Sequence, residues 1–194
     1  MSDDDRRHWD RRYADRGPAG LDEVGLPSPF RDFSDVFPRT GTGLDVACGR
    51  GGAAIWLAQR GLTVHGYDVS AVAVSQAREL AQLAGCAERC HFEVVDLEAG
   101  LPPGPPAGVI VCSRFRDARL DDVLIARLAP DGLLAVSALS EVGANPGRYR
   151  AARGELTRAF ARLEVLAAAE ADGLAWVLAR KPALAKISTW PRSR

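Results

Sequence analysis

The sequence lacks the features that would place it in a membrane. None of the hydrophobic stretches in its 194 residues is long enough to span a bilayer, and the first residues, Met-Ser-Asp-Asp-Asp-Arg-Arg, contain no apolar leader segment. The chain also carries no net charge, because 25 basic residues balance 25 acidic ones. An overall charge that would attract nucleic acid or an anionic membrane surface is therefore absent. We expect a cytoplasmic protein that binds a small molecule, with no nucleic-acid or membrane partner.

Cysteine is scarce, and its spacing does not indicate a metal site. None of the four cysteines, Cys48, Cys86, Cys90 and Cys112, belongs to a Cys-x-x-Cys pair. Cys86, Cys90 and His91 could supply three zinc ligands, but a structural zinc site needs a fourth. We interpret the cysteines as reduced thiols that pack in the interior, and we predict no metal.

The remaining composition is typical of one globular domain. Hydrophobic residues make up 47% of the chain and charged residues 26%, over a length that allows a sizeable core. We expect a single domain over residues 1–194, with an N-terminal lid segment and connector at 1–29 and a core at 39–180. The basic tail at 181–194 contains no acidic residue and is expected to be mobile.

A glycine cluster between a short strand and a helix organises the first half of the chain. Thr42–Val46 is apolar enough to form a buried strand, and Ala53–Ala58 is typical of a helix that ends at Gly61. Between them, Gly49 and Gly51 allow positive φ angles and a close approach of the backbone to a ligand. A strand, a glycine loop and the unpaired N–H groups of a helix start together predict a nucleotide-type site.

Two absences narrow the choice of nucleotide. The loop has no lysine for phosphates, which excludes a P-loop, and it lacks the third glycine of the Gly-x-Gly-x-x-Gly dinucleotide motif. The next predicted strand, Thr63–Asp68, ends in an acid, and Ser70 can cap the helix that follows. A carboxylate at the end of the second strand of an open α/β sheet can accept both hydroxyls of a ribose. Asp68 is therefore the predicted ribose ligand.

Strands and helices alternate through most of the chain, and this order predicts the fold. After Asp68 we predict a helix at 71–84, a strand at 91–97, a proline-rich connection at 101–106 and a strand at 108–113. A helix at 117–129 and a strand at 133–139 follow. The last predicted elements are a short helix at 154–160 and strands at 163–169 and 174–179. The alternation favours an α/β, doubly wound sheet of parallel strands joined by right-handed crossovers. The last two strands are separated by a hairpin-like turn, so a terminal antiparallel pair is expected.

One motif in the glycine loop resembles that of a known family. Asp45, Ala47, Gly49, Gly51 and Ala53 alternate an acid with small residues. This pattern resembles the first motif of class I S-adenosylmethionine-dependent methyltransferases, with alanine at two of the family's usual glycines. Over roughly residues 9–180, the chain is similar to the small tellurite-resistance and thiopurine-like groups. The resemblance implies a seven-stranded Rossmann-like methyltransferase sheet and transfer of a methyl group from S-adenosyl-L-methionine, which leaves S-adenosyl-L-homocysteine.

The resemblance also implies a set of cofactor contacts. Asp96 would meet the adenine amino group, and the backbone N–H of Leu97 would meet a ring nitrogen. Trp9, Arg12 and Tyr13 match a Trp-x-x-Arg-Tyr segment that folds over the cofactor as a lid in many related enzymes; the alternative is an amphipathic helix that only packs on the domain. The expected cofactor contacts are Trp9, Arg12, Tyr13, Asp45, Ala47, Gly49, Arg50, Gly51, Asp68, Val69, Asp96, Leu97 and Ser113.

The acceptor site is less well defined. The segments similar to those of the tellurite-resistance group are Ser113-Arg114-Phe115-Arg116-Asp117, after the fourth strand, and Asn145-Pro146 with Gly154-Glu155-Leu156, after the fifth. The histidine of that group is missing here. We predict that Arg114 and Arg148 bind an anionic or electron-rich small acceptor. The other arginines of these segments are interpreted as solvated surface residues, namely Arg116, Arg119, Arg150 and Arg153.

No catalytic side chain is predicted. A methyl group on a sulfonium is already activated, and in-line displacement needs mainly correct positioning. Two other functions stay open on the sequence: an NAD(P)-binding oxidoreductase, and a methyltransferase-like domain that binds the cofactor without catalysis. A monomer and a homodimer are both compatible with the sequence.

Overall fold

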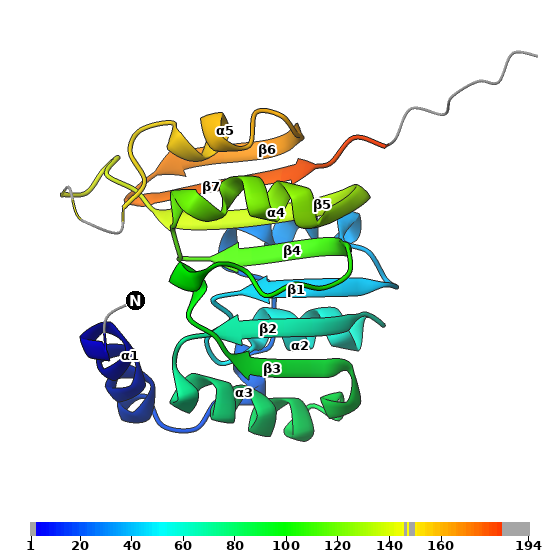
Figure 1. Cartoon of the computed structure of the whole chain (residues 1–194), viewed down its shortest axis with the longest axis vertical. Helices are drawn as coiled ribbons and strands as arrows, with labels where there is room; N and C mark the ends of the chain where they lie inside the picture. Colours follow the sequence, from blue (N-terminus) through cyan, green and yellow to red (C-terminus); the bar gives the residue numbers. More distant parts are fainter. Residues whose placement is uncertain (1–2, 146, 148–149, 184–194) are drawn as a thin grey trace, which may run out of the picture.

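A seven-stranded sheet with helices on both faces forms the body of the protein (Figure 1). The computed structural model describes residues 3–145, 147 and 150–183. The strands are β1 (Thr42–Val46), β2 (Thr63–Asp68), β3 (Cys90–Val94), β4 (Ala107–Ser113), β5 (Leu128–Leu139), β6 (Glu164–Ala171) and β7 (Leu174–Arg180). Their spatial order is β3-β2-β1-β4-β5-β7-β6.

The strand directions confirm the predicted topology. β1 pairs in parallel with β2 and β4, and the pairs β2–β3 and β4–β5 are also parallel. β7 is antiparallel to both of its neighbours, β5 and β6. The sheet is thus doubly wound and mostly parallel, with a terminal antiparallel pair.

The helices and the sheet bury one hydrophobic cluster on each face. The helical segments are α1 (Asp3–Asp15), α2 (Gly52–Gln59), α3 (Ala71–Leu83), α4 (Asp121–Arg127) and α5 (Glu155–Ala159), with short 3-10 turns η1 (Leu21–Glu23), η2 (Ser28–Val36), η3 (Ala87–Arg89), η4 (Leu97–Ala99) and η5 (Ala118–Leu120). Side chains alternate between the faces of a strand, so Val109 of β4 packs with α2, α3 and η2 while Ile110 packs with α4 and α5. Within the described residues, no helix is long and apolar enough to cross a membrane.

Most element boundaries agree with the sequence pattern. β1 and β2 have the predicted ends, and Ser70 caps α3 as expected, because its Oγ accepts the N–H of Ala73 at 3.1 Å. The main differences lie where a distant residue intervenes. β5 begins at Leu128 instead of residue 133, because Leu128 pairs with Ala107 of β4 before an irregularity in the register. β3 ends at Val94, before the expected residue 97, because η4 follows directly.

The connection from β3 to β4 is the proline-rich strap predicted from the sequence, with the turn η4 at its start. Arg127 Nη1 donates to the carbonyl of Pro102 at 2.9 Å and fastens this strap across the sheet. Over residues 95–106, all of them described, the only helical segment is η4. His91 and Glu93 of β3 are consequently exposed. The strap thus leaves part of one sheet face open to solvent.

Candidate cofactor and acceptor site

The glycine loop joins β1 to α2 at the carboxyl end of the sheet. β1 lies between β2 and β4, where the strand order reverses, and open α/β sheets bind ligands at this point. Ala47, Gly49 and Gly51 have φ angles of 56°, 53° and 78°. The N–H of Cys48 donates to the carbonyl of Tyr67 at 2.9 Å, and the N–H of Gly51 donates to the carbonyl of Cys48 at 2.9 Å. The loop is therefore tied to β2 and folded tightly on itself.

Asp68, the predicted ribose ligand, lies directly beside this loop. Its Oδ2 accepts the N–H of Gly49 at 2.8 Å, and its Oδ1 accepts the N–H of Ser70 at 2.9 Å. Burial raises the pKa of this carboxyl, and backbone hydrogen bonds from Ser70, Gly49 and Val69 oppose that rise. Each carboxylate oxygen has two acceptor sites, so at least one site stays open for a ribose hydroxyl.

Asp45 lies beneath the loop and supports the helix behind it. Its Oδ2 accepts the N–H of Ala54 at 3.0 Å, one of the groups that a helix start leaves unpaired. Burial raises the pKa of Asp45 to about 7, against the lowering effect of this hydrogen bond. This hydrogen bond gives Asp45 a supporting role in the loop, and the cofactor contact expected of it stays a prediction.

The two loop glycines are required for different reasons. A Cβ at Gly49 would lie 2.8 Å from the hydroxyl of Tyr13, so this side of the loop faces the N-terminal helix. A Cβ at Gly51 would lie 2.7 Å from Cζ of Phe92, whose ring also fills the space beside Gly66. Gly51 therefore permits core packing with Phe92. The approach of a ligand to the backbone of Gly49 and Gly51 stays a prediction.

Arg50 is directed away from the loop rim. Its Nη1 donates to the carbonyl of Gly17 at 2.9 Å, and its guanidinium forms an ion pair with the carboxylate of Glu23. The side chain is only 8% exposed. Arg50 thus holds the connector of residues 17–23 against the glycine loop, and the cofactor contact expected of this residue stays a prediction.

The helix α1 lies beyond the carboxyl ends of β2 and β3 (Figure 1). Its Trp9 and Tyr13 have ring centroids 6.1 Å apart, and the guanidinium of Arg12 lies 5.3 Å from the centre of the Trp9 ring. Asp10 anchors the helix, because its Oδ1 accepts the hydroxyl of Ser70 at 2.6 Å and the N–H of Val72 at 3.3 Å. The two predicted aromatics thus share one helix face, and Tyr13 reaches the glycine loop.

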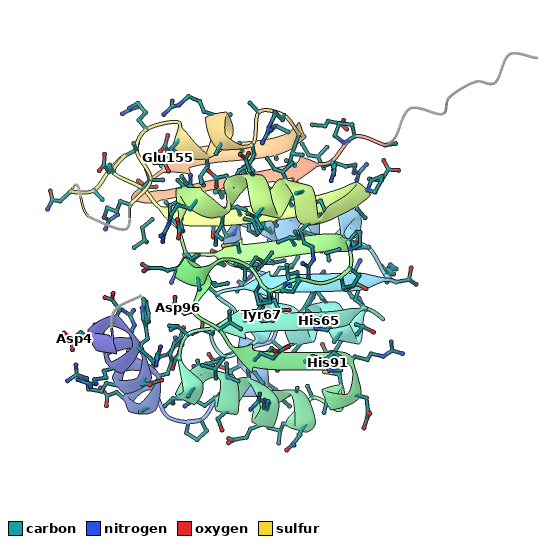
Figure 2. The ribbon with its side chains drawn as sticks, viewed as in Figure 1. Asp4, His65, Tyr67, His91, Asp96 and Glu155 are labelled. Carbon is teal, nitrogen blue, oxygen red and sulfur yellow. The ribbon has the colours of Figure 1, made fainter. Side chains whose placement is uncertain are left out.

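The expected adenine contacts lie next to Asp68. The N–H of Val95 donates to the carbonyl of Asp68 at 2.8 Å, which joins the segments that follow β2 and β3. Val69 and Leu97 are buried in these segments, whereas Asp96 lies at the rim (Figure 2). Asp96 Oδ1 accepts the N–H of Glu98 at 3.0 Å. The predicted ribose ligand, after β2, and the predicted adenine ligands, after β3, therefore lie side by side at the carboxyl end of the sheet.

At the end of β4, Arg114 adopts a backbone conformation that is unusual for its residue type. Its φ angle is 56°, and its N–H is shared between the carbonyl of Ser137 at 2.8 Å and the hydroxyl of Ser137 at 3.2 Å. Ser113 Oγ lies 3.1 Å from Ser137 Oγ. The side chain of Arg114 is exposed. Ser137 of β5 thus fixes the point where β4 leaves the sheet.

The other arginines that follow β4 and β5 differ in exposure and in their hydrogen-bond partners. The interpretation of Arg116 as a solvated residue is wrong: it is 8% exposed, its Nη1 lies 2.6 Å from Asp121 Oδ1, and its Nε lies 2.6 Å from Glu155 Oε1. Arg150 is half-buried and donates to the carbonyl of Ser140 at 2.7 Å. Arg119 and Arg153 are exposed, as predicted. Arg148 lies outside the described residues.

Three residues that shape the site were not identified from the sequence. Asp10 lies among several charged residues, so the sequence does not distinguish it from its neighbours. Phe92 looks like any other apolar residue of a strand. Ser137 interrupts the apolar run of β5, and this interruption was the one available signal. A buried hydroxyl in a central strand needs a hydrogen-bond partner, which here is the start of the acceptor loop.

The donors and acceptors at this end of the sheet fit S-adenosylmethionine. Asp68 has acceptor capacity for a ribose, and the loop backbone at Gly49 is not covered by a side chain of its own. A lysine for phosphates is missing from the loop, in agreement with a cofactor that has none. The described residues could therefore hold this cofactor with Asp68, Gly49 and the rim around Asp96.

Part of the chain also matches a known protein family. Residues 44–129 match the family described as methyltransferase domain, a range that includes the glycine loop, Asp68 and Arg114. No curated protein sequence matches the chain. TehB from Haemophilus influenzae has a similar structure, with a TM-score of 0.70 and 18% identity over 80% of this chain and 62% of TehB. The chain thus spans less than two thirds of TehB.

Two further solved structures share the fold. Magnesium protoporphyrin IX methyltransferase (ChlM) from Synechocystis PCC 6803, solved with bound S-adenosylmethionine, has a TM-score of 0.62 and 19% identity over 79% of this chain and 76% of ChlM. The cyclase SpnF has a TM-score of 0.63 and 20% identity over 79% of this chain and 81% of SpnF. Residues 44–129 thus match a methyltransferase domain, and the sheet order with its terminal antiparallel strands is the fold of these methyltransferase structures.

Proposed function

We propose that the protein transfers a methyl group from S-adenosyl-L-methionine to a small-molecule acceptor. The proposal rests on one observation above all: the carboxylate of Asp68 lies 2.8 Å from the N–H of Gly49 at the point where the strand order reverses. S-adenosylmethionine supplies, when bound, a methyl group on a positively charged sulfur, so the leaving group needs no further activation. The product is S-adenosyl-L-homocysteine.

The residues of the chain would then bind and position the reactants. Asp68 accepts the ribose hydroxyls, and Asp96 with the N–H of Leu97 binds the adenine. Tyr13 and Trp9 cover the glycine loop and exclude water from it; their place on α1, with Tyr13 against Gly49, supports this role. Precise positioning can lower the barrier of a displacement by about 7 to 11 kcal/mol in the best intramolecular cases. No general base is needed for a thiolate, an amine or an oxyanion.

The proposed acceptor is an anionic or electron-rich small molecule near Arg114. Arg116 and Arg150 are occupied by partners within the chain, whereas the side chain of Arg114 is exposed at the exit of β4. An exposed guanidinium beside the cofactor site attracts carboxylates, oxyanions and thiolates. Arg148 is proposed as a second ligand on its place in the sequence.

A calorimetric titration tests the function. S-adenosylmethionine and S-adenosylhomocysteine should bind to the full chain, and NAD should not. The same samples are then incubated with S-adenosylmethionine and a panel of small thiols, amines, carboxylates and oxyanions, and formation of S-adenosylhomocysteine is measured. Tight binding of NAD without a response to the other two would show an oxidoreductase. Cofactor binding without turnover of any acceptor would favour a binding domain, and the name of SpnF shows that this fold also occurs in a cyclase.

A further inference from the structure

Two histidines face each other on the open part of the sheet. His65 of β2 and His91 of β3 are register partners in the parallel pair, and their ring centroids are 5.0 Å apart with an angle of 35° between the planes. Figure 2 shows both rings on the near face of these strands, well separated from Asp96 at the carboxyl end. His91 is exposed and His65 is half-buried, because the β3–β4 strap contains no α-helix that would cover them.

The distance between the rings matches that of two imidazoles bound to one metal ion. Imidazole nitrogens lie about 2.0–2.1 Å from zinc. The ring centre lies roughly 1.2 Å further out, so two imidazoles at a tetrahedral angle have centroids about 5 Å apart. We propose that His65 and His91 form a binding site for a divalent transition-metal ion such as Zn²⁺ or Ni²⁺.

The charged residues around the two histidines include one that attracts a metal ion and one that repels it. Glu93 follows His91 on the same face of β3, and its carboxylate attracts a cation. Neutral imidazole is the form that binds a metal ion. Arg127 repels a cation, but its guanidinium is held at the carbonyl of Pro102. The attraction of Glu93 offsets part of this repulsion.

The site differs from a closed structural zinc site. In the part of the chain that the structure describes, no three His, Cys, Asp or Glu side chains converge on one point, so water or an added ligand must complete the coordination. Cys90 cannot join His91, because neighbouring residues of a strand point to opposite faces. The thiol of Cys90 is instead buried 4.0 Å from that of Cys86. The three-residue zinc site considered from the sequence is therefore excluded by the strand geometry.

An ion held by both rings would bridge β2 to β3 in the folded state only. Ligands that bind only the folded state raise the unfolding temperature by mass action. The prediction is one-to-one binding of Zn²⁺ and Ni²⁺ in calorimetry and a higher unfolding temperature that EDTA reverses.

The chain offers a matched control for this experiment. Of its three histidines, only His8 lies elsewhere, on α1. His65→Gln and His91→Gln should each weaken binding of both ions at least tenfold and abolish the thermal shift, whereas His8→Gln should leave both unchanged. Glu93→Gln should weaken binding by a smaller factor. Unfolding of each variant without metal is measured first, and if His65→Gln fails to fold, the exposed His91→Gln variant decides.

Three outcomes would overturn the proposal. The wild-type chain could bind neither ion, or His8→Gln could lose binding as well. Binding that survives in both His65→Gln and His91→Gln would show that the ions bind elsewhere in the chain. The affinity for S-adenosylmethionine, measured on the same samples, should not change in any of these variants, so the result is independent of the proposed function.

Discussion

The cofactor half of the sheet, β1 to β3, and the acceptor half, β4 to β7, are fixed by different kinds of contact. In the cofactor half, Asp68 and Asp45 accept backbone N–H groups, those of Gly49, Ser70 and Ala54. In the acceptor half, Arg116 reaches Glu155, 39 residues away. A contact to a backbone N–H does not depend on which side chain the donor residue carries, whereas a pair of charged side chains depends on both residue types.

The largest effect is expected from breaking the main ion pair of the acceptor half. Arg116→Met keeps the aliphatic length but leaves Asp121 and Glu155 without their cation. Removing one partner of a buried pair costs about 3 kcal/mol or more of folding free energy, and here the lower end applies because both acids are partly exposed. Urea unfolding monitored by circular dichroism measures the change.

The matched control for this substitution is Arg119→Met. The side chain of Arg119 is 63% exposed and is paired mainly with its neighbour Asp117. Its replacement should change the stability by less than about 0.5 kcal/mol. Equal losses in the two variants would mean that the Arg116 network does not hold the acceptor half together.

The second effect concerns the cofactor half. Asp68→Ala removes the acceptor of the ribose and also the acceptor of the Gly49 and Ser70 N–H groups. We expect the affinity for S-adenosylmethionine to fall by about 2 to 3 kcal/mol, with some loss of stability, because charge-assisted hydrogen bonds are lost. Calorimetry at equal folded concentration separates the two effects. An unchanged dissociation constant would remove Asp68 from the site.

The pH dependence of the same site follows from the environment of Asp68. Burial raises its folded pKa above that of an exposed aspartate, so the carboxylate becomes protonated at a higher pH than usual. Protonation turns one acceptor oxygen into a donor and weakens ribose binding. The wild-type affinity should therefore fall as the pH is lowered, whereas Asp68→Asn should bind weakly with a flat profile over the same range.

The contrast between the halves also explains which features could be predicted from the sequence and which could not. The ends of β1 and β2, the cap at Ser70 and the terminal antiparallel strands follow from local patterns of apolar, glycine and capping residues. Arg116 resembles any surface arginine because its partner Glu155 is distant in the sequence. The role of Gly51 depends on the Phe92 ring, which reaches the loop from β3. Local chemistry was predictable, and contacts between distant segments were not.

A smaller effect is expected at the junction of α1 with the cofactor half. Asp10→Ala removes the acceptor for the Ser70 hydroxyl and the Val72 N–H, and a lost capping contact of this kind costs about 1 kcal/mol. If α1 is a lid, as we propose, this loss appears mainly as a roughly fivefold weaker binding of S-adenosylmethionine, with little change in global unfolding. Deletion of residues 1–16 should weaken binding further. Global unfolding of the truncated chain would instead identify α1 as core packing.

The smallest effect is expected at Arg114, where the two halves meet. Arg114→Met keeps the aliphatic part of the side chain and removes the charge, and the hydrogen bonds to Ser137 persist because they come from the backbone N–H. The affinity for S-adenosylmethionine should stay the same within error. For an anionic acceptor, the loss of one exposed charge should raise KM roughly twofold, equivalent to about 0.5 kcal/mol, and should reduce the dependence of KM on salt. Steady-state kinetics at low and high salt measure both changes.

The matched control is Arg153→Met, which removes an exposed arginine from the segment after β5 and should leave KM unaltered. Equal KM values and equal salt dependence in wild type and Arg114→Met would contradict the anion site and leave the acceptor to be sought among neutral nucleophiles.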